Sequence, residues 1–574
     1  MQSVYFDLLK QWCDELIEHQ VKNMGPEFDG AFLCPACKVE HGRCQDAVYP
    51  FMYMADRTGD MKYVEAAKAV FDWHERNMYC DDGSVYNDAN AEWRYITVFE
   101  SIALCEALER HSSLLDGETR AKWENKLARM ANWLYHELTE DAPTNINYTA
   151  TNAAALALTG KYFDNEAYIA QAEHLAAYAL EHITPNGLLY GEGKPRDVVT
   201  PRGCRAIDIG YNVEESIPSL VKYAVAVGDD AALDKLTDVL HKQLSFMLPD
   251  GAWDNSFGSR NNKWTYYGSR TSDGCQAGYA LLADRDPAFA EASLRNALLM
   301  QACSKDGLLH GGLQYVEHGE PACVHHTFTH ANAITCALDA GIEQYAERAA
   351  LPEDAGYTPI RYFPELDTYK LAVGNLRATV TGYDYDLNAG HASGGTMTML
   401  WHKTAGPVIA ASVVDYKLVE YLNQQLPLKR DRHRPLVPRV ELMSDGKRYS
   451  QCYDTRSVIT TSGNNQQVSV KVHASLVAID QTPIASPVCV KLEYRLTSDE
   501  IGISGRVYGR KCTDARFVLP VIGDMPRVDV HGKYTTKDIF FLTGGFGATE
   551  YTICPDADGR FAVTIALPQA EKAE

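Results

Sequence analysis

The sequence has no long hydrophobic run. Its apolar stretches all fall short of the roughly 18 to 20 residues that a membrane-spanning helix needs. The first residues, Met1 to Cys13, have the spacing of an amphipathic helix and lack the charged-then-apolar pattern of a secretion signal. We therefore expect a chain without a membrane span.

Positive charge is also scarce. Lys and Arg number 54 against 76 Asp and Glu, which gives a formal net charge of −22. Nucleic acids and anionic membrane surfaces are bound through clustered basic faces. The charge balance therefore argues against both classes of partner, and a polyanionic ligand would need a local basic pocket.

The cysteines lack the pattern of a disulfide framework. There are 15, an odd number, and most stand singly inside helical patterns, as Cys105 does. Single cysteines of this kind are typical of buried thiols. The exception is the run Cys34, Cys37, His41 and Cys44, whose residue types and spacing suit a tetrahedral zinc ion. This run is a candidate structural zinc site; in the alternative, His41 faces a pocket and the cysteines are ordinary thiols.

The chain divides into a helical part and a β part. With 574 residues it is longer than one hydrophobic core supports. Residues 1–350 are rich in segments with apolar residues three and four apart, which predict helices. Residues 371–574 show alternating apolar runs separated by turns, which predict antiparallel sheets in a sandwich. The proline-containing segment 351–370 is the expected linker.

A short turn motif recurs in the helical part. Asp-Gly or Asn-Gly is followed by small or apolar residues and, in most copies, by an aromatic residue. Such pairs supply the positive φ of a tight turn, and a stub of strand can follow. The copies lie roughly 45 to 65 residues apart, which fits one helical hairpin each. They begin at Asp29, Asp82, Asn186, Asp250 and Asp306, with a degenerate copy near 141–148.

Six such hairpins predict a closed ring. The expected fold is therefore α+β and multidomain, an N-terminal (α/α)6 toroid followed by an antiparallel β-sandwich. The alternatives are an open helical solenoid or two helical domains, although an open array usually repeats more evenly and has polar caps. In a closed ring, all the turns and the starts of the inner helices meet at one rim, where we expect a site.

Polar and aromatic side chains are dense just after each turn. Polar groups at hidden helix ends are costly unless something binds them. Aromatic rings can stack on a sugar face while Arg, Asn and carboxylates meet hydroxyl groups, so the pattern predicts a carbohydrate site. About half of these residues would only cap helices or pair with one another. Those expected to bind substrate are His41, Arg43, Arg94, Tyr148, Glu214, Glu215, Trp253, Tyr266, Arg270 and His325.

Tyr211 is the candidate base. A tyrosine has an ordinary pKa near 10, but adjacent guanidinium groups such as that of Arg205 favour its phenolate. Arginines beside it can hold a substrate carboxylate, which acidifies the neighbouring carbon. This is the chemistry of β-elimination from a uronic acid. In the alternative, the Tyr211 hydroxyl is merely hydrogen-bonded at a helix start.

Three histidines form a second cluster. His326 and His330 lie four residues apart on one helix face, the spacing of zinc ligands in metalloproteases. Thr327 stands where those enzymes have Glu, which argues against that class. Acid or base work and hydrogen bonds to sugar fit His325, His326 and His330 better, with a structural role for at least one of them.

This arrangement resembles the toroid polysaccharide lyases, which include heparinase-like and alginate lyases. The resemblance spans nearly the whole chain and includes the segment 395–415. Residues 34–50 and 210–216 are more narrowly similar to the gut-bacterial L-rhamnose-α-1,4-D-glucuronate lyases, which act on arabinogalactan. The Asn-Asn-His motif of alginate-type lyases is absent, since Asn147, Tyr148 and Asn152 occupy the comparable stretch.

The resemblance implies a central pocket, a tyrosine base and a plant-type acidic oligosaccharide or polysaccharide as substrate. It also implies chemistry that requires no cofactor, and a periplasmic or extracellular location.

The leading hypothesis is a lyase that cleaves a 4-linked uronic acid glycoside. Tyr211 would abstract the C5 proton, and a histidine of the 325–330 cluster would protonate the leaving C4 oxygen. Arg205 and Arg270, with Asn152, would neutralise the carboxylate and stabilise the enolate-like intermediate.

Two rival hypotheses remain. A glycoside hydrolase on the same toroid would use Glu214, Glu215 or Asp208 as paired carboxylates, with a cysteine-zinc arabinofuranosidase as a special case. A non-catalytic glycan-binding protein would use the same pocket without breaking a bond.

Overall fold

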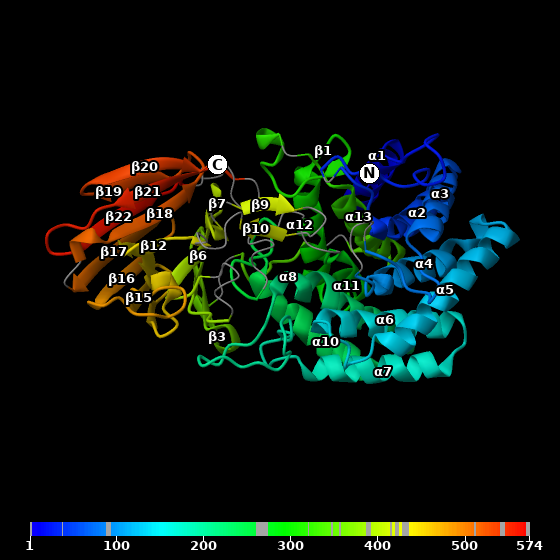
Figure 1. Cartoon of the computed structure of the whole chain (residues 1–574), viewed down its shortest axis with the longest axis horizontal. Coiled ribbons are helices and arrows are strands. Elements are labelled where there is room, and N and C mark those ends of the chain that lie inside the picture. The colour runs from blue at the N-terminus through cyan, green and yellow to red at the C-terminus, as the bar shows by residue number, and fades with distance from the viewer. Residues whose placement is uncertain are drawn as a thin grey trace.

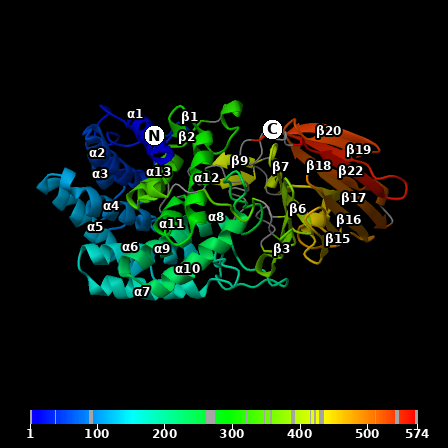
Figure 2. The ribbon, with the colours of Figure 1, turned by 180° about the vertical axis from the view of Figure 1, so that it is seen from behind.

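The computed structural model contains a helical region and a region of β-sheets, which lie at opposite ends of the molecule (Figure 1). The view from behind shows the same division (Figure 2). Within the described residues, no helix combines the length and apolarity needed to cross a membrane. The structure describes residues 3–569 except 37, 88–92, 260–273, 320, 346–347, 355–357, 386–391, 414–415, 420–423, 428–434, 510–511 and 540–545.

The helices form two concentric layers. The outer helices are α1 (Val4–Glu18), α3 (Lys62–Asn77), α5 (Gly117–Glu137), α7 (Glu166–Glu181), α10 (Asp230–Gln243) and α12 (Pro287–Cys303). The inner helices are α2 (Val48–Thr58), α4 (Thr97–His111), α6 (Ile146–Tyr162), α9 (Ile217–Val227), α11 (Gln276–Leu281) and α13 (Val324–Asp339).

The inner helices form a closed ring. In chain order, each one from α2 to α13 packs against the next, and α13 packs against α2. Helices α4, α6 and α13 are consequently buried around most of their circumference. The predicted toroid is confirmed, and the open solenoid is excluded.

Most outer helices begin at a polar capping residue. In each case the side-chain oxygen accepts a hydrogen bond from an amide of the first turn, which satisfies one otherwise unpaired donor. These local signals fix where the outer helices start. The capping residues are Ser3, Asp116, Asn165, Asp229 and Asp286.

The recurring turns have the predicted geometry. Each of the five clear copies closes a short antiparallel bridge or ladder, such as that between Tyr79 and Val85, and none occurs among the described residues of the degenerate copy near 141–148. A Cβ atom on Gly83 would lie only 2.5 Å from the carbonyl oxygen of Arg129 in α5, so this turn needs glycine for space as well as for φ. The motif glycines have φ between 77° and 104°: Gly30, Gly83, Gly187, Gly251 and Gly307.

The rim that carries the turns faces the β domain. Asn186 donates from Nδ2 to Glu365 Oε2 at 2.9 Å, and Trp401 donates from Nε1 to Asp250 Oδ2 at 2.7 Å. A buried ion pair of 2.6 Å joins Lys370 to Asp254 just beyond the fourth clear turn. These contacts place the rim between the ring and the sheets.

In the part of the β domain that the structure describes, there are three larger antiparallel sheets. The sheet against the toroid runs β3 (Ile360–Phe363), β4 (Thr368–Val373), β5 (Leu376–Thr381), β6 (Thr396–His402) and β7 (Gly406–Ala410). The second runs β13 (Lys447–Ser450), β12 (Arg439–Ser444), β18 (Arg516–Ile522), β21 (Ala548–Ile553) and β20 (Tyr534–Ile539). The third runs β14 (Val458–Gly463), β15 (Val468–Ser475), β16 (Val488–Leu496), β17 (Glu500–Gly509), β22 (Arg560–Ala566) and β19 (Arg527–His531).

One apolar core joins these sheets. Leu376 of β5, Leu492 of β16 and Phe517 of β18 belong to the same buried cluster. Alternate residues of β15 and β16 are buried, as expected for strands with one face against a core. The predicted antiparallel sandwich is confirmed. Short strands complete the set: β1 (Ser304–Lys305), β2 (Leu308–Leu309), β8 (Ser412–Val413), β9 (Tyr416–Val419), β10 (Gln424–Pro427) and β11 (Pro435–Leu436).

Candidate active site

A small cavity with charged walls lies on the axis of the ring. Its volume of about 60 Å³ is far below the roughly 300 to 1,000 Å³ of a typical small-molecule pocket. Inner helices α4, α6, α9, α11 and α13 contribute to the wall, together with the short helix η1 (Gly42–Ala47) that precedes α2. The lining includes Arg43, Asp46, Phe99, Ile102, Thr151, Glu214, Glu215, Lys222, Ala277, Thr329 and Asn332.

The chain enters one wall of this cavity through an irregular turn. Helix α8 (Ile209–Tyr211) passes into a π-helical turn, Asn212–Ser216, before α9 begins. Asp208 caps the start by accepting a hydrogen bond from the Tyr211 amide at 2.8 Å. Pro218 has no amide hydrogen to donate in the stretch that follows. Single π turns occur often at functional sites. This one carries both predicted carboxylates, Glu214 and Glu215, and directly follows the predicted base Tyr211.

The two carboxylates of the π turn are buried and line the cavity. Glu214 and Glu215 are 2% and 3% exposed. The Asn147 side-chain amide donates to Glu215 Oε1, and the Asn147 backbone amide donates to Glu192 Oε1 at 3.2 Å. Because Asn147 opens inner helix α6, these bonds tie the π turn to the neighbouring hairpin.

Arg43 places a fixed positive charge on the opposite side of the cavity wall. Its Nε donates to Asp46 Oδ2 at 3.0 Å, and its guanidinium carbon lies 4.3 Å from the centroid of the Phe99 ring. The side chain is buried with its partner. An ion pair and a cation–π contact together hold the guanidinium in one position.

Exposed and half-buried aromatic rings form a platform at the rim. Trp93 is 39% exposed and donates from Nε1 to the Tyr148 hydroxyl at 2.8 Å. The Tyr148 ring lies 5.9 Å from that of Phe99, and Tyr95 packs on Trp93 at 5.0 Å. The platform therefore joins the cavity wall through Phe99.

The histidines of α13 lie in a stack with His41. The rings of His41 and His325 are 5.2 Å apart, and those of His325 and His326 are 5.8 Å apart and nearly parallel. Burial, with His41 and Arg43 nearby, holds the pKa of His325 well below its usual value. His330 Nδ1 lies 2.6 Å from the His326 carbonyl oxygen, so the neutral ring keeps Nε2 as its acceptor.

Arg205 and Asn152 lie away from this cavity wall. The Arg205 guanidinium stacks 4.1 Å from the centre of the Tyr190 ring. Asn152 donates from Nδ2 to the Leu138 carbonyl at 2.7 Å and to that of Leu134 at 3.3 Å, at the end of α5. The structure thus shows both side chains in contacts with neighbouring parts of the ring, and their predicted contact with a substrate carboxylate stays a prediction.

Two residues predicted to bind substrate also have other contacts. Trp253 is fully buried and stacks on the Tyr279 ring, so it belongs to the core. Arg94 pairs with Asp82 at 2.8 Å and donates to the Tyr86 hydroxyl at 3.2 Å, which ties it to the second turn. The predicted Tyr266 and Arg270 lie outside the described residues.

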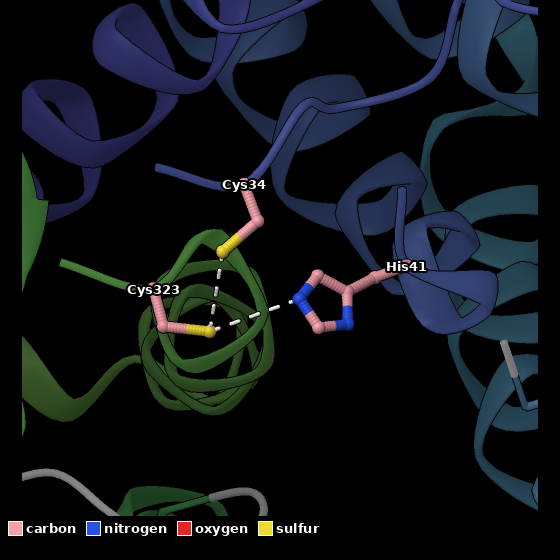
Figure 3. A group of neighbouring side chains, drawn as sticks. All are labelled: Cys34, His41 and Cys323. Carbon is pink, nitrogen blue, oxygen red and sulfur yellow. Dashed lines mark hydrogen bonds between the residues drawn. The ribbon is translucent and has the colours of Figure 1, made fainter. Parts of the chain in front are cut away.

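The predicted cysteine cluster is partly rearranged. Cys34 and His41 do meet, but the third member is Cys323, the residue that precedes α13 (Figure 3). Cys44 is buried but does not belong to this group, and Cys37 lies outside the described residues. No disulfide joins the cysteines that the structure describes.

Comparison with known proteins identifies the family. Residues 9–354 match the family described as "Ulvan lyase N-terminal domain", and residues 360–531 match "Ulvan lyase C-terminal domain". The chain belongs to the ulvan lyase family. A curated relative, the "Broad-specificity ulvan lyase" of Formosa agariphila, is 42% identical over 458 residues, which cover 78% of this chain and 71% of the relative.

Solved structures show the same fold in other lyases. Heparinase III aligns with a TM-score of 0.51 at 13% identity, covering 96% of this chain and 79% of that one. The chondroitin AC lyase of Streptomyces coelicolor A3 aligns with a TM-score of 0.52 at 10% identity, covering 99% and 80%. The expected resemblance to toroid polysaccharide lyases is confirmed, and this member of the ulvan lyase family is a polysaccharide lyase.

A buried polar network in this ulvan lyase family member escaped sequence reasoning. Lys126 of α5 donates to Gln45 Oε1 at 2.5 Å and to His74 Nδ1 at 2.8 Å, and His74 Nε2 lies 2.9 Å from Glu100 Oε2. Burial raises the pKa of Glu100 to about 8 and lowers that of Lys126 to about 8. The network fixes the wall that carries Arg43.

The exposed Trp93 and its neighbour Tyr95 also escaped prediction. They flank Arg94, and the sequence pattern predicted a binding role for that arginine alone. An aromatic residue on either side of an arginine, just after a turn motif, is the signal that was available.

Proposed function

We propose that this polysaccharide lyase cleaves the bond between rhamnose and a uronic acid in an acidic polysaccharide, with ulvan as the first candidate. Support comes from the relative named as a broad-specificity ulvan lyase. Ulvan contains rhamnose and glucuronate. Rhamnose-capped arabinogalactan presents the same pair of sugars and is the second candidate.

The observation that carries the proposal is the set of groups at one rim. An aromatic platform of Trp93 and Tyr148 adjoins, through Phe99, the fixed guanidinium of Arg43. Across the cavity lies the π turn that follows Tyr211. Rings that stack on sugar, a cation for a carboxylate and a candidate base are the parts that β-elimination needs.

In the proposed reaction, Arg43 offsets the charge of the uronate carboxylate and so acidifies C5. Tyr211 as phenolate accepts the C5 proton. The electron pair of that C–H bond forms the C4–C5 double bond while the C4–O bond breaks. The departing rhamnose oxygen receives a proton from a histidine of the 325–330 cluster. The products are an unsaturated uronate and a free reducing rhamnose.

Product chemistry tests this proposal. The purified protein is incubated separately with ulvan and with rhamnose-capped arabinogalactan, and the ultraviolet absorbance of the unsaturated uronate is followed. Absorbance should rise with ulvan and should be lost in Tyr211→Phe, whereas Tyr168→Phe, on outer helix α7, serves as the matched control. New reducing ends without the chromophore would show hydrolysis and overturn the proposal. If the absorbance rose with arabinogalactan and not with ulvan, arabinogalactan would take the place of ulvan as the proposed substrate.

A further inference from the structure

Three metal-binding side chains from distant segments meet beside the cavity. Cys34 lies after the first turn, His41 precedes the short helix η1 (Gly42–Ala47), and Cys323 precedes α13. All three are at most 2% exposed. Figure 3 shows the two sulfur atoms and the imidazole turned toward one common point.

The spacing of these atoms suits one small cation. The sulfur atoms of Cys34 and Cys323 are 3.7 Å apart, and His41 Nε2 lies 3.9 Å from the Cys323 sulfur. Tetrahedral zinc with Zn–S bonds of about 2.3 Å holds its sulfur ligands about 3.8 Å apart. Two thiolates and an imidazole without a carboxylate form a ligand set that favours zinc over magnesium or calcium.

A fourth side chain lies next to the three. The His325 ring is 5.2 Å from that of His41. Both of its ring nitrogens are buried and have no hydrogen-bond partner among the described residues. A buried imidazole without partners is costly, and a metal ion at this position would remove that cost.

We propose that Cys34, His41 and Cys323, whose ligand atoms lie within 4.8 Å of one another, bind one structural zinc ion. The nitrogens of His325 lie outside that group, so His325 would turn toward the ion to become the fourth ligand. Cys34 belongs to the first hairpin of the ring and Cys323 to the last. The ion therefore ties the two ends of the toroid together, next to the contact between α1 and α13.

Metal content and stability test the zinc site. Elemental analysis of the purified full-length protein should find about one zinc per chain. Cys34→Ser and Cys323→Ser should lose the metal and melt at a lower temperature. Cys44→Ala, which changes a buried cysteine of the same sequence run outside the cluster, should keep it.

Other outcomes would overturn this assignment. Less than about a tenth of an equivalent of zinc in protein produced with added zinc would do so, as would a Cys34–Cys323 disulfide found by peptide mapping without reduction. If Cys44→Ala were the variant that lost zinc, the ligands would instead be the four predicted from the sequence, Cys34, Cys37, His41 and Cys44. Full zinc content with unchanged affinity in His325→Ala would overturn the fourth ligand only. If a cysteine variant fails to fold, the wild-type protein is titrated with a thiol-blocking mercurial instead. Zinc should then be released as the thiols react.

A second and independent feature lies on the outer face of the six-stranded sheet. The strand register places His473 opposite Lys491, Lys491 opposite Arg506, and Arg506 opposite Arg560. Four basic side chains thus form one row across β15, β16, β17 and β22. All four are exposed.

Basic side chains directly opposite one another are unfavourable for the stability of a sheet. Strands about 4.8 Å apart bring these cations close together. Among the described residues, Asp558 lies 3.7 Å from Arg560, and the acidic Glu493 and Asp556 also line the groove, so the positive charge of the row is partly offset. A groove of about 1,220 Å³ lies over the row, and Lys471 and Lys533 add positive charge to its lining. In a chain of net charge −22, this is the local basic surface that a polyanion requires.

The geometry points to a binding groove for an anionic polysaccharide on the β domain, separate from the toroid cavity. The choice of a glycan rests on the proposed function. The groove would hold the polymer while the rim cleaves it, which raises the local concentration of substrate.

Affinity electrophoresis tests the groove without relying on catalysis. Wild-type protein should be retarded in gels that contain ulvan, and a Lys491→Ser, Arg506→Ser, Arg560→Ser triple variant should lose at least about tenfold in affinity. The matched control is Lys68→Ser, Arg120→Ser, Lys235→Ser, which removes the same charge from the outer helices α3, α5 and α10.

Gels that contain heparin or dextran sulfate test the groove separately from the proposed cleavage of ulvan. Retardation that depends on the row in any glycan gel supports the groove even if ulvan is never cleaved. Equal retardation of wild type and triple variant in every gel overturns it. Retardation by DNA with none by glycans also overturns it.

Discussion

The sulfur of Cys323 lies 3.7 Å from the sulfur of Cys34, although 289 positions separate the two residues in the chain. The contact joins the start of the last inner helix to the loop after the first turn. It therefore spans the seam where the ring closes, and the first prediction concerns that seam.

Removal of the proposed zinc should weaken the closed ring. Treatment with a strong zinc chelator should lower the melting temperature by several degrees, because a ligand that binds only the folded state stabilises it. Differential scanning fluorimetry before and after zinc is restored measures the effect. Cys323→Ser should not respond to the chelator, and an equal response would point to a different ion.

Substitution of Arg43 and of Arg205 should have different effects on catalysis. Arg43→Ala should lower kcat/KM on the cleaved polysaccharide by about 10²- to 10³-fold, because a charge held at the cavity wall is lost. Arg205→Ala should stay close to the wild-type value, since its guanidinium stacks on Tyr190. Steady-state kinetics of both variants decide the matter; the reverse order of effects would return the carboxylate contact to Arg205.

Trp93 is expected to act through binding. Trp93→Ala should raise KM about tenfold with little change in kcat, since stacking contributes about 1 to 2 kcal/mol in both the ground and transition states. Trp93→Phe should recover most of the loss. A fall in kcat at unchanged KM would show that the ring acts in the chemical step instead.

The buried carboxyl of Glu100 predicts a pH effect on stability. Its pKa is raised to about 8 in the folded protein, so the unfolded chain releases this proton at lower pH than the folded one. The stabilising contribution is fully present below the ordinary Glu pKa and declines as pH rises toward 8. Glu100→Gln should therefore gain stability relative to wild type between about pH 5 and pH 8. Melting temperatures at the two pH values test this, and a constant difference would contradict it.

Gly83 and Gly117 test the turn motif. Gly83→Ala should cost about 2 kcal/mol or more, because φ is 98° and the new Cβ would meet the Arg129 carbonyl oxygen. At Gly117, the first residue of α5, a Cβ meets nothing within 4 Å and φ is not positive. Gly117→Ala should be neutral or stabilising in urea denaturation. Equal effects at both sites would refute the special role of the turn.

The fold could be predicted because its signals are local. Helical spacing, capping residues and the Asp-Gly turns each act within a few residues, and together they specify a series of hairpins. Closure into a ring was favoured over an open solenoid by the uneven spacing of the repeats, and the contact between α13 and α2 establishes it. The alternation in segments such as β5 and β6 likewise gave the strands directly.

The site was predicted less completely because side-chain direction depends on helix phase and on distant partners. Asn147 and Asn152 differ by five positions, or about 140° around α6, so only the first reaches Glu215 while the second meets the end of α5. Cys323 shares no local pattern with Cys34. Both facts become visible only once the ring is closed.

Closure of the ring also sets an order for folding during synthesis. Helix α1 is synthesised before α13, yet the surface that covers α1 belongs in part to α13, which emerges more than 300 residues later. Until then the apolar side of α1, with Leu8 and Trp12, has no final partner. We therefore expect the first hairpin to complete its packing only after the last one has been synthesised.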